Sequence, residues 1–172
     1  MAEKLAKFFI GIFGGIASVW WGKYLVMFII SLMPILELRG GLIAASLMDA
    51  PMIQSFIVCF IGNILPIPFI LWFITSIFEF LKKKNGRLGK LVEKIEKKAN
   101  SKKEQIERLK YLGLVLFVGI PLPGTGAWTG CLIAALLGMD KKKSCLAAIL
   151  GVIMAGIIML IFSYGILGGI LR

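Results

Sequence analysis

The sequence contains no histidine, only three cysteines, and nine acidic residues against twenty lysines and arginines. The lack of histidine excludes imidazole acid–base catalysis and histidine-ligated zinc. Cys59, Cys131 and Cys145 stand in or beside apolar segments, and this scattered set gives neither a disulfide framework nor metal-ligand spacing. Paired acids and nucleophile–base spacings are also missing. We therefore expect no catalytic residue, no metal and no cofactor, and we do not expect an enzyme.

Charge is missing from most of the chain and is concentrated in one segment. Of the 172 residues, 59% are hydrophobic, and uncharged apolar runs recur along the chain. This composition predicts an all-α integral membrane protein with a single membrane domain over residues 1–172. Residues 82–110 hold twelve of the twenty basic residues. The positive-inside rule places this segment in the cytoplasm of a multi-pass protein of the cell (inner or plasma) membrane, with no nucleic acid as partner.

One acid and one base, Glu37 and Arg39, stand deep in apolar sequence beside a proline and two glycines. Each charge would cost roughly 2.5–3.5 kcal/mol at the centre of a lipid-facing helix, and proline and glycine interrupt helices. Broken, charged backbone is tolerated at membrane depth only where protein buries it or where it lines a wet cavity. The stretch 34–45 therefore predicts a binding site for a solute or an ion.

The segments before the basic stretch predict a helix, a hairpin and a span. Residues 5–21 form an N-terminal helix that either crosses the membrane or lies in its interface. Residues 24–49 contain two apolar halves, each too short to cross, around the break at residues 34–41. This pattern predicts a re-entrant helical hairpin. Residues 50–80 are long enough to span the membrane once, with a kink at two closely spaced prolines.

The second half repeats this order after the basic stretch. At residues 82–110, apolar residues at helical spacing predict one or two amphipathic helices on an anionic leaflet, with a solvated charged loop as the alternative. Residues 111–139 again hold two short apolar halves around a break, and three lysines follow. A second re-entrant hairpin keeps both basic segments in the cytoplasm, and a single broken crossing is the alternative. Residues 144–171 form a final span rich in glycine and small residues.

The two broken units resemble each other at a distance of about ninety residues. The run Gly-Gly-Leu-Ile-Ala-Ala at 40–45 matches Gly-Cys-Leu-Ile-Ala-Ala at 130–135. Further matches are Met48 and Asp49 with Met139 and Asp140, Tyr24 with Tyr111, and Gly62 with Gly151. Each unit contributes one hairpin and one crossing, so the second must enter from the opposite face. Two inverted repeats whose broken helices meet at mid-depth are typical of secondary transporters.

The candidate site residues come from both broken units. Glu37 is interpreted either as a proton-coupling carboxylate or as part of a structural pin with Arg39 or with polar backbone. Arg39 is interpreted either as a clamp for an anion such as a lipid phosphate or as part of the same pin. Asn63 either completes the polar cluster or satisfies carbonyls freed by Pro66. The loop at 121–130 is either the opposing wall of the site or a packing contact between hairpin tips. The full predicted set of substrate- and proton-binding residues is Glu37, Arg39, Gly40, Gly41, Asn63, Pro121, Pro123, Gly124, Thr125, Gly126, Trp128 and Thr129.

Two motifs carry a resemblance to a known family. The run Glu-Leu-Arg-Gly-Gly-Leu-Ile-Ala-Ala from Glu37 and the run Pro-Leu-Pro-Gly-Thr-Gly-Ala-Trp-Thr-Gly from Pro121 resemble the signatures of the small multidrug export protein family. The hairpin-and-span plan is also similar to that of the DedA/VTT superfamily, which includes lipid carriers and scramblases. That resemblance implies a proton-coupling role for the acid in the first hairpin, matched here by Glu37. DedA proteins typically carry arginines in the second hairpin, and this chain has none there.

These observations predict a small membrane transporter or exporter, proton-coupled, that moves a small or lipid-like solute. A lipid scramblase or flippase acting on a polyprenyl phosphate or a phospholipid is one alternative, and a non-transporting membrane scaffold is another. The expected partners are the lipid bilayer, a small-molecule or lipid substrate, and a second copy of the chain in a homodimer.

Overall fold

The computed structural model describes residues 11, 15, 21–83, 92–94, 97, 110–122 and 124–167. Every regular element within these residues is a helix, so the prediction of an all-α protein is confirmed. Most residues of the expected N-terminal helix at 5–21 and of the basic amphipathic segment at 82–110 lie outside the described residues. The named elements are α3 (Gly22–Leu32), α4 (Glu37–Leu47), α5 (Met52–Ile64), α6 (Pro66–Lys83), α9 (Lys110–Gly119), α10 (Ala127–Leu136), α11 (Lys141–Leu160) and the π-helix η1 (Ile161–Leu167).

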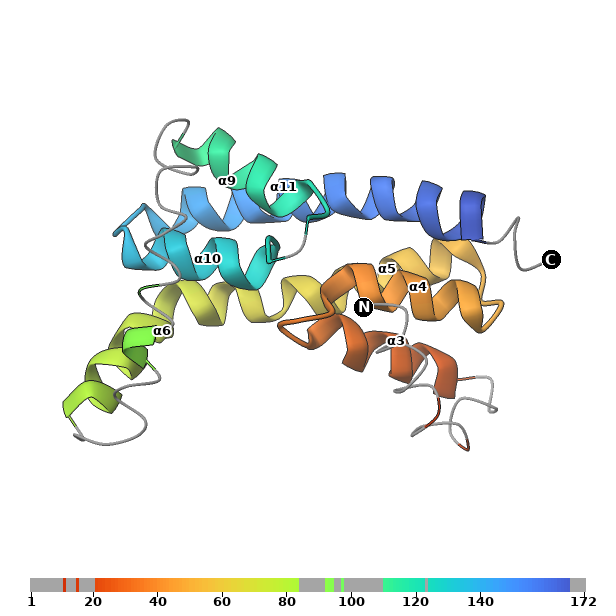
Figure 1. Ribbon diagram of the computed structural model, residues 1–172, viewed down its shortest axis with the longest axis horizontal. Helices are drawn as coiled ribbons and strands as arrows, with labels where there is room; N and C mark the ends of the chain where they lie inside the picture. The colour runs from red at the N-terminus through yellow and green to blue at the C-terminus, as the bar shows by residue number, and fades with distance from the viewer. Residues whose placement is uncertain are drawn as a thin grey trace.

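Helices α3 and α4 form an antiparallel pair whose turn lies near the centre of the molecule (Figure 1). Each helix has 11 residues, which corresponds to about 16 Å of helix. Pro34 follows Met33, the residue that caps the end of α3, and a residue without a backbone N–H cannot continue the helix. The pair therefore starts and finishes at the same end of the molecule, on the right in Figure 1.

Helices α9 and α10 form a second pair at the opposite end, on the left in Figure 1. Each has 10 residues. The turn between them contains Pro121 and the two glycines Gly124 and Gly126, whose φ angles are +79° and +143°. Only glycine adopts such angles easily. This turn points back toward the centre and meets the turn of the first pair.

Two longer helices run along the length of the molecule. Helix α5 passes into α6 through Leu65, which directly precedes Pro66 and keeps helical backbone angles. The apolar segment Met52–Ile74 has 23 residues, and the segment Lys141–Gly165 has 25. Both are long and apolar enough to cross a membrane. Helix α11 begins at Lys141 because the Asp140 side chain accepts a hydrogen bond from the Lys143 N–H at 2.9 Å.

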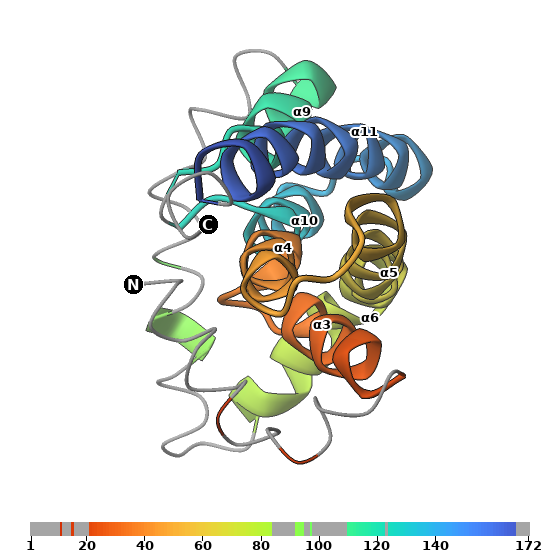
Figure 2. The same ribbon diagram turned by 90° about the vertical axis from the view of Figure 1, so that its right-hand side faces the viewer.

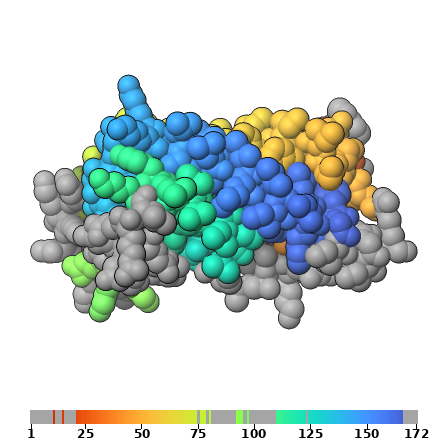
Figure 3. Space-filling view, turned by 90° about the horizontal axis from the view of Figure 1, so that it is seen from above, coloured from red at the N-terminus to blue at the C-terminus, as the bar shows by residue number. Residues whose placement is uncertain are grey.

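Helices α4 and α10 occupy the middle of the bundle. Helix α4 packs against α3, α5 and α11, while α10 packs against α6, α9 and α11. In the end-on view of Figure 2, α10 lies above α4, with α9 and α11 above the two, α5 beside them and α3 below. Seen from above in Figure 3, α11 and η1 extend along one face, with α9 and α5 on either side. Most of the side chains buried between these helices are apolar, and they include Met27, Leu42, Leu114 and Ile133.

Glycines set the closest helix contacts. A Cβ atom on Gly62 of α5 would lie 2.9 Å from the Phe28 carbonyl oxygen of α3, and one on Gly151 of α11 would lie 2.9 Å from the Val115 carbonyl oxygen of α9. A Cβ atom on Gly41 would collide with the hydroxyl of Ser31. Small residues at these positions let the backbones approach, as in many membrane helix bundles.

Candidate functional site

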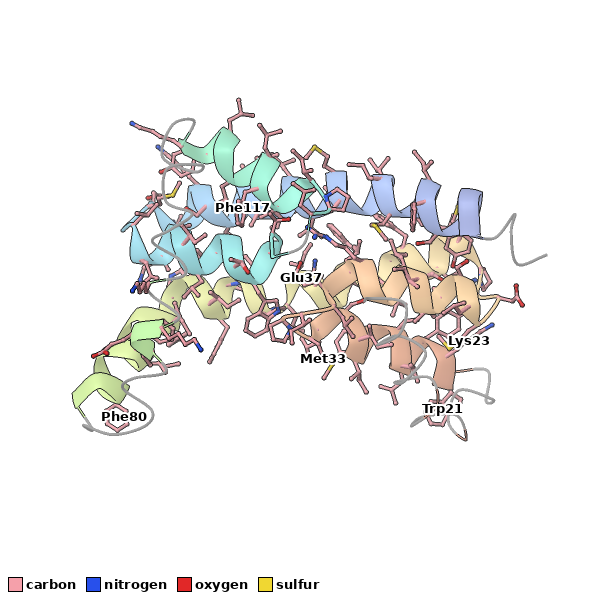
Figure 4. The ribbon with its side chains drawn as sticks, in the orientation of Figure 1. Trp21, Lys23, Met33, Glu37, Phe80 and Phe117 are labelled. Atoms are coloured by element: carbon pink, nitrogen blue, oxygen red, sulfur yellow. The ribbon has the colours of Figure 1, made fainter. Side chains whose placement is uncertain are left out.

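The turns of the two helix pairs meet in the interior, and Glu37 lies at that meeting point (Figure 4). We call the contacts between the first turn of α4 and the segments 118–122 and 125–128 the tip interface. It is built mainly from helix ends, where backbone N–H and carbonyl groups have no partner within their own helix. The two charges predicted from the sequence meet these groups.

The Glu37 carboxylate caps the N-terminus of α10. Its Oε2 accepts a hydrogen bond from the Ala127 N–H at 3.1 Å, and its Oε1 accepts one from the Trp128 N–H at 3.0 Å. The side chain is 5% exposed. The N-terminus of a helix carries partial positive charge and favours an anion. A carboxylate from the first pair therefore binds the second pair directly, through two hydrogen bonds.

Gly126 provides the space that the carboxylate occupies. A Cβ atom at this position would lie only 2.6 Å from the Glu37 Cδ and would collide with its oxygens. Glu37 itself has a φ of +52°, which is uncommon for a residue with a side chain. Such a conformation persists only where the surroundings determine it. The two hydrogen bonds to α10 provide that restraint.

The Arg39 guanidinium caps the opposite kind of helix end. Its Nη1 donates to the Leu122 carbonyl at 2.8 Å, and its Nη2 lies 3.2 Å from both the Val118 and Ile120 carbonyl oxygens and from the Thr125 Oγ1. These carbonyls lie in the last turn of α9 and in the residues just after it. They carry partial negative charge and suit a planar cation with several donors. Arg39 therefore binds the second helix pair from the same turn of α4 as Glu37.

Trp128 reaches back in the other direction. Its indole Nε1 donates to the carbonyl of Leu32, the last residue of α3, at 3.2 Å. Arg39 thus caps the end of α9, and Trp128 caps the end of α3. The tip interface is reciprocal, because each pair supplies a side chain that satisfies the broken end of the other.

The structure brings only part of the predicted set into the tip interface. Glu37, Arg39, Thr125, Gly126 and Trp128 are in it. Pro121 lies among the carbonyls bound by Arg39 and shapes the turn, as does Gly124. Pro123 lies outside the described residues.

Four predicted residues have other positions. Gly40 and Gly41 pack α4 against neighbouring side chains, including those of Leu36 and Ser31, so their surroundings are those of helix-packing residues. Thr129 lies one residue beyond the interface on α10. Asn63 is 2% exposed, and its Oδ1 has no hydrogen-bond partner. Neither sequence interpretation of Asn63 accounts for that unpaired oxygen.

Sequence reasoning offered polar backbone as one partner of Glu37 but did not identify which backbone groups bind Glu37 and Arg39. The carbonyls of Val118, Ile120 and Leu122 and the N–H of Ala127 carry the interface, yet any residue type supplies such groups. The available signal was the break itself, since a helix that ends just before Pro121 leaves its last carbonyls unpaired. A buried arginine elsewhere in the chain is the natural partner for them.

The comparisons with known proteins point to one family. No curated protein and no solved structure matches the chain. A family model does match, over residues 37–158, and its description reads "Putative small multi-drug export protein". The matched region begins at Glu37 and contains both sides of the tip interface and most of the two long apolar helices. The match covers well over half of the chain, so the chain belongs to the small multidrug export protein family.

Proposed function

We propose that this protein is a small transporter of the cell membrane that exports a small or lipid-like solute and couples its movement to protons through Glu37. The observation that carries the proposal is the buried carboxylate of one helix pair bound to the N-terminus of a helix in the other pair. A titratable group at the contact between two halves can change how firmly the halves are joined. The membership of the family, whose description names export, supports transport as the activity.

The helix lengths support two re-entrant hairpins. Helices of 10 or 11 residues reach about 15–16 Å, only half of a hydrocarbon core of about 30 Å. Each pair returns to the end from which it started, and the two turns meet midway along the longer helices (Figure 1). The tip interface would then lie near mid-depth, where charged groups need protein partners.

Matching contacts support an inverted repeat. The packing of Gly62 against Phe28 corresponds to that of Gly151 against Val115, about ninety residues later. In the first half Tyr24 donates a hydrogen bond to Gln54, and at the equivalent place in the second half Lys143 lies 5.9 Å from the centre of the Tyr111 ring. The chain runs through the two halves in opposite directions along the molecule (Figure 1).

The ends of α4 and α10 correspond as well. The Ala50 N–H donates to the Ala45 carbonyl at 3.0 Å, and the Met139 N–H donates to the Ala134 carbonyl at 3.0 Å. Before each donor stands a residue with positive φ, Asp49 at +49° and Gly138 at +65°. Both helices therefore end in the same left-handed motif.

The proposed coupling follows from the chemistry of the carboxylate. Ionised, Glu37 accepts from both N–H groups and complements the partial positive charge of α10. Once protonated, it has lost its charge, and one of its oxygens carries a hydrogen that faces an N–H donor. The tip interface is then weaker, and the two hairpins can separate. Return of the proton to water restores the joined state, so each cycle exchanges one proton.

Proton flux tests this proposal. Purified protein in liposomes with an internal pH dye is given candidate solutes, and wild type is compared with Glu37→Gln at matched folded yield. We expect solute-dependent proton flux in wild type and none in Glu37→Gln, because the amide keeps the shape but cannot exchange a proton. Arg39→Ala should reduce flux by weakening the interface while leaving residual coupling. Flux that is unchanged in Glu37→Gln would overturn the assignment of the coupling residue.

A scaffold without transport is the second candidate, and one observation favours it. Both carboxylate oxygens of Glu37 accept hydrogen bonds from the backbone of α10, and the residue is 5% exposed, so its charge is satisfied inside the protein as a structural pin requires. The liposome experiment separates the two functions. A scaffold gives no flux with any solute, and both variants lose folded protein. A lipid scramblase would instead show transbilayer movement of labelled lipid that depends on Arg39.

A further inference from the structure

An open hollow with a volume of about 250 Å³ lies beside the tip interface, between the two halves. Pro34 contributes from the turn of the first helix pair, Ile70, Ile74 and Phe78 contribute from α6, and Trp128 and Leu132 contribute from α10. Binding sites of transporters with inverted repeats lie near mid-depth at the interface of the repeats. The hollow has that position if the two halves are repeats.

The lining selects a chemical class. Among the described residues, no lining side chain is charged, and Thr129 supplies a hydroxyl group. A charged ligand would lose its hydration there without gaining a partner. An apolar cavity of about 150 Å³ is enough to hold benzene, so a hollow of this volume suits a molecule of about two fused rings. The Phe78 and Trp128 rings offer aromatic contact, and one polar substituent can reach Thr129.

Trp128 joins the hollow to the coupling group. Its indole lines the hollow, its indole N–H binds the Leu32 carbonyl, and its backbone N–H binds the Glu37 carboxylate. A ligand that moves the indole acts on the residue that holds the carboxylate. We propose that this hollow binds an uncharged aromatic molecule of about two rings, and that its occupancy is coupled to Glu37 through Trp128. This inference rests on the proposed function and names the substrate class at the same interface.

A single-tryptophan variant provides the test. Trp20, Trp21 and Trp72 are replaced by phenylalanine, which leaves Trp128 as the only indole. In nanodiscs of saturated phospholipid, 2-naphthol should quench Trp128 emission with a saturable curve and raise the unfolding temperature. The charged relative 2-naphthalenesulfonate should do neither. Linear, unsaturable quenching by 2-naphthol would overturn the proposal, because it reports only partition into the bilayer.

Two matched substitutions locate the site. Leu132→Phe adds bulk inside the hollow and should weaken saturable 2-naphthol binding about tenfold or more. Leu146→Phe makes the same change on α11, at a side chain that is 61% exposed and does not line the hollow, and it should leave binding unchanged. Equal effects of the two would overturn the assignment of the hollow. Because occupancy is coupled to Glu37, the affinity for 2-naphthol should depend on pH in wild type and should not depend on pH in Glu37→Gln.

A lipid acyl chain is the competing occupant, and the assay separates it. Nanodiscs with brominated acyl chains quench Trp128 if a chain fills the hollow. If 2-naphthol still raises the unfolding temperature in these nanodiscs, it displaces the chain from a ligand site open to the bilayer, whereas quenching by the brominated chains with no effect of 2-naphthol on the unfolding temperature overturns the proposal in favour of lipid. Binding without proton flux would leave this site standing and reject the proposed function. Proton flux with other solutes but no binding of 2-naphthol would reject this site and leave the proposed function standing.

Discussion

At the scale of single residues, the fit between Glu37 and Gly126 determines whether the two helix pairs can join. Glycine is required at 126 for two reasons, the φ of +143° and the carboxylate that fills the place of a side chain. A methyl group there would push the flexible carboxylate away from α10, so that the charge stays buried while its hydrogen bonds are lost.

Gly126→Ala should therefore behave like a loss of Glu37. Charge-assisted hydrogen bonds contribute about 1.5–3 kcal/mol, and we expect a lower unfolding temperature together with lost proton flux. Gly138→Ala is the matched control, because Gly138 also has positive φ (+65°) but no heavy atom within 4 Å of the added Cβ. Thermal unfolding in detergent compares the two. If Gly138→Ala costs as much stability as Gly126→Ala, the collision with Glu37 is not the cause.

The charged members of the interface were predictable from the sequence, whereas their partners were not. Glu37 and Arg39 stand out because lipid-facing charge is costly. The sequence interpretation left open whether the two pair with each other, and their hydrogen bonds instead go to backbone groups of α10 and of the end of α9. Asn63 was singled out by its polarity, but its position depends on how α5 turns, which apolar periodicity alone does not determine.

At the scale of helices, Gly62 makes the close contact of α5 with α3, and Gly151 makes that of α11 with α9. In each case the nearest obstacle to a side chain includes a backbone carbonyl, which cannot rotate away. The sequence indicated the correspondence of Gly62 and Gly151 through their spacing. It could not indicate which helix each glycine approaches, because that depends on packing between segments distant in the chain.

If the halves are equivalent, Gly62→Ala and Gly151→Ala should destabilise the protein by similar amounts, about 1–3 kcal/mol each by overpacking. The double variant should show the sum, because distant sites act independently. Gly165→Ala, where the added Cβ meets nothing within 4 Å, should change stability by less than about 0.5 kcal/mol. Denaturant titration of the purified variants measures all four. A large loss at one glycine and none at the other would contradict the equivalence.

At the scale of the whole molecule, the order of short and long helices determines the topology. The all-α fold and the two long apolar helices could be predicted from composition and run length alone. The contacts by which the two turns bind each other could not be predicted, because the sequence of each turn indicates only that a helix is interrupted there and not which distant segment it contacts. The proposed re-entrant arrangement assigns each loop to a side of the membrane.

Single cysteines added to a chain without Cys59, Cys131 and Cys145 test those sides. With re-entrant hairpins, a cysteine at Asp49 should react with an impermeant maleimide from outside intact cells, and one at Asp140 should react only after the membrane is opened. A single broken crossing through residues 111–139 predicts external labelling at Asp140 instead. In intact cells, we expect labelling of the cysteine at position 49 and no labelling of the cysteine at position 140.

The pairing of one glutamate with one glycine across the tip interface has an energetic consequence for the proposed transport. If Glu37 is the coupling carboxylate, this contact exchanges one proton rather than two, because Gly126 opposite it has no side chain. A one-proton exchanger gains about 2.3 kcal/mol for each 100 mV of driving force. Since about 1.4 kcal/mol corresponds to a tenfold ratio, the steepest solute gradient such a carrier could sustain is roughly fifty-fold per 100 mV.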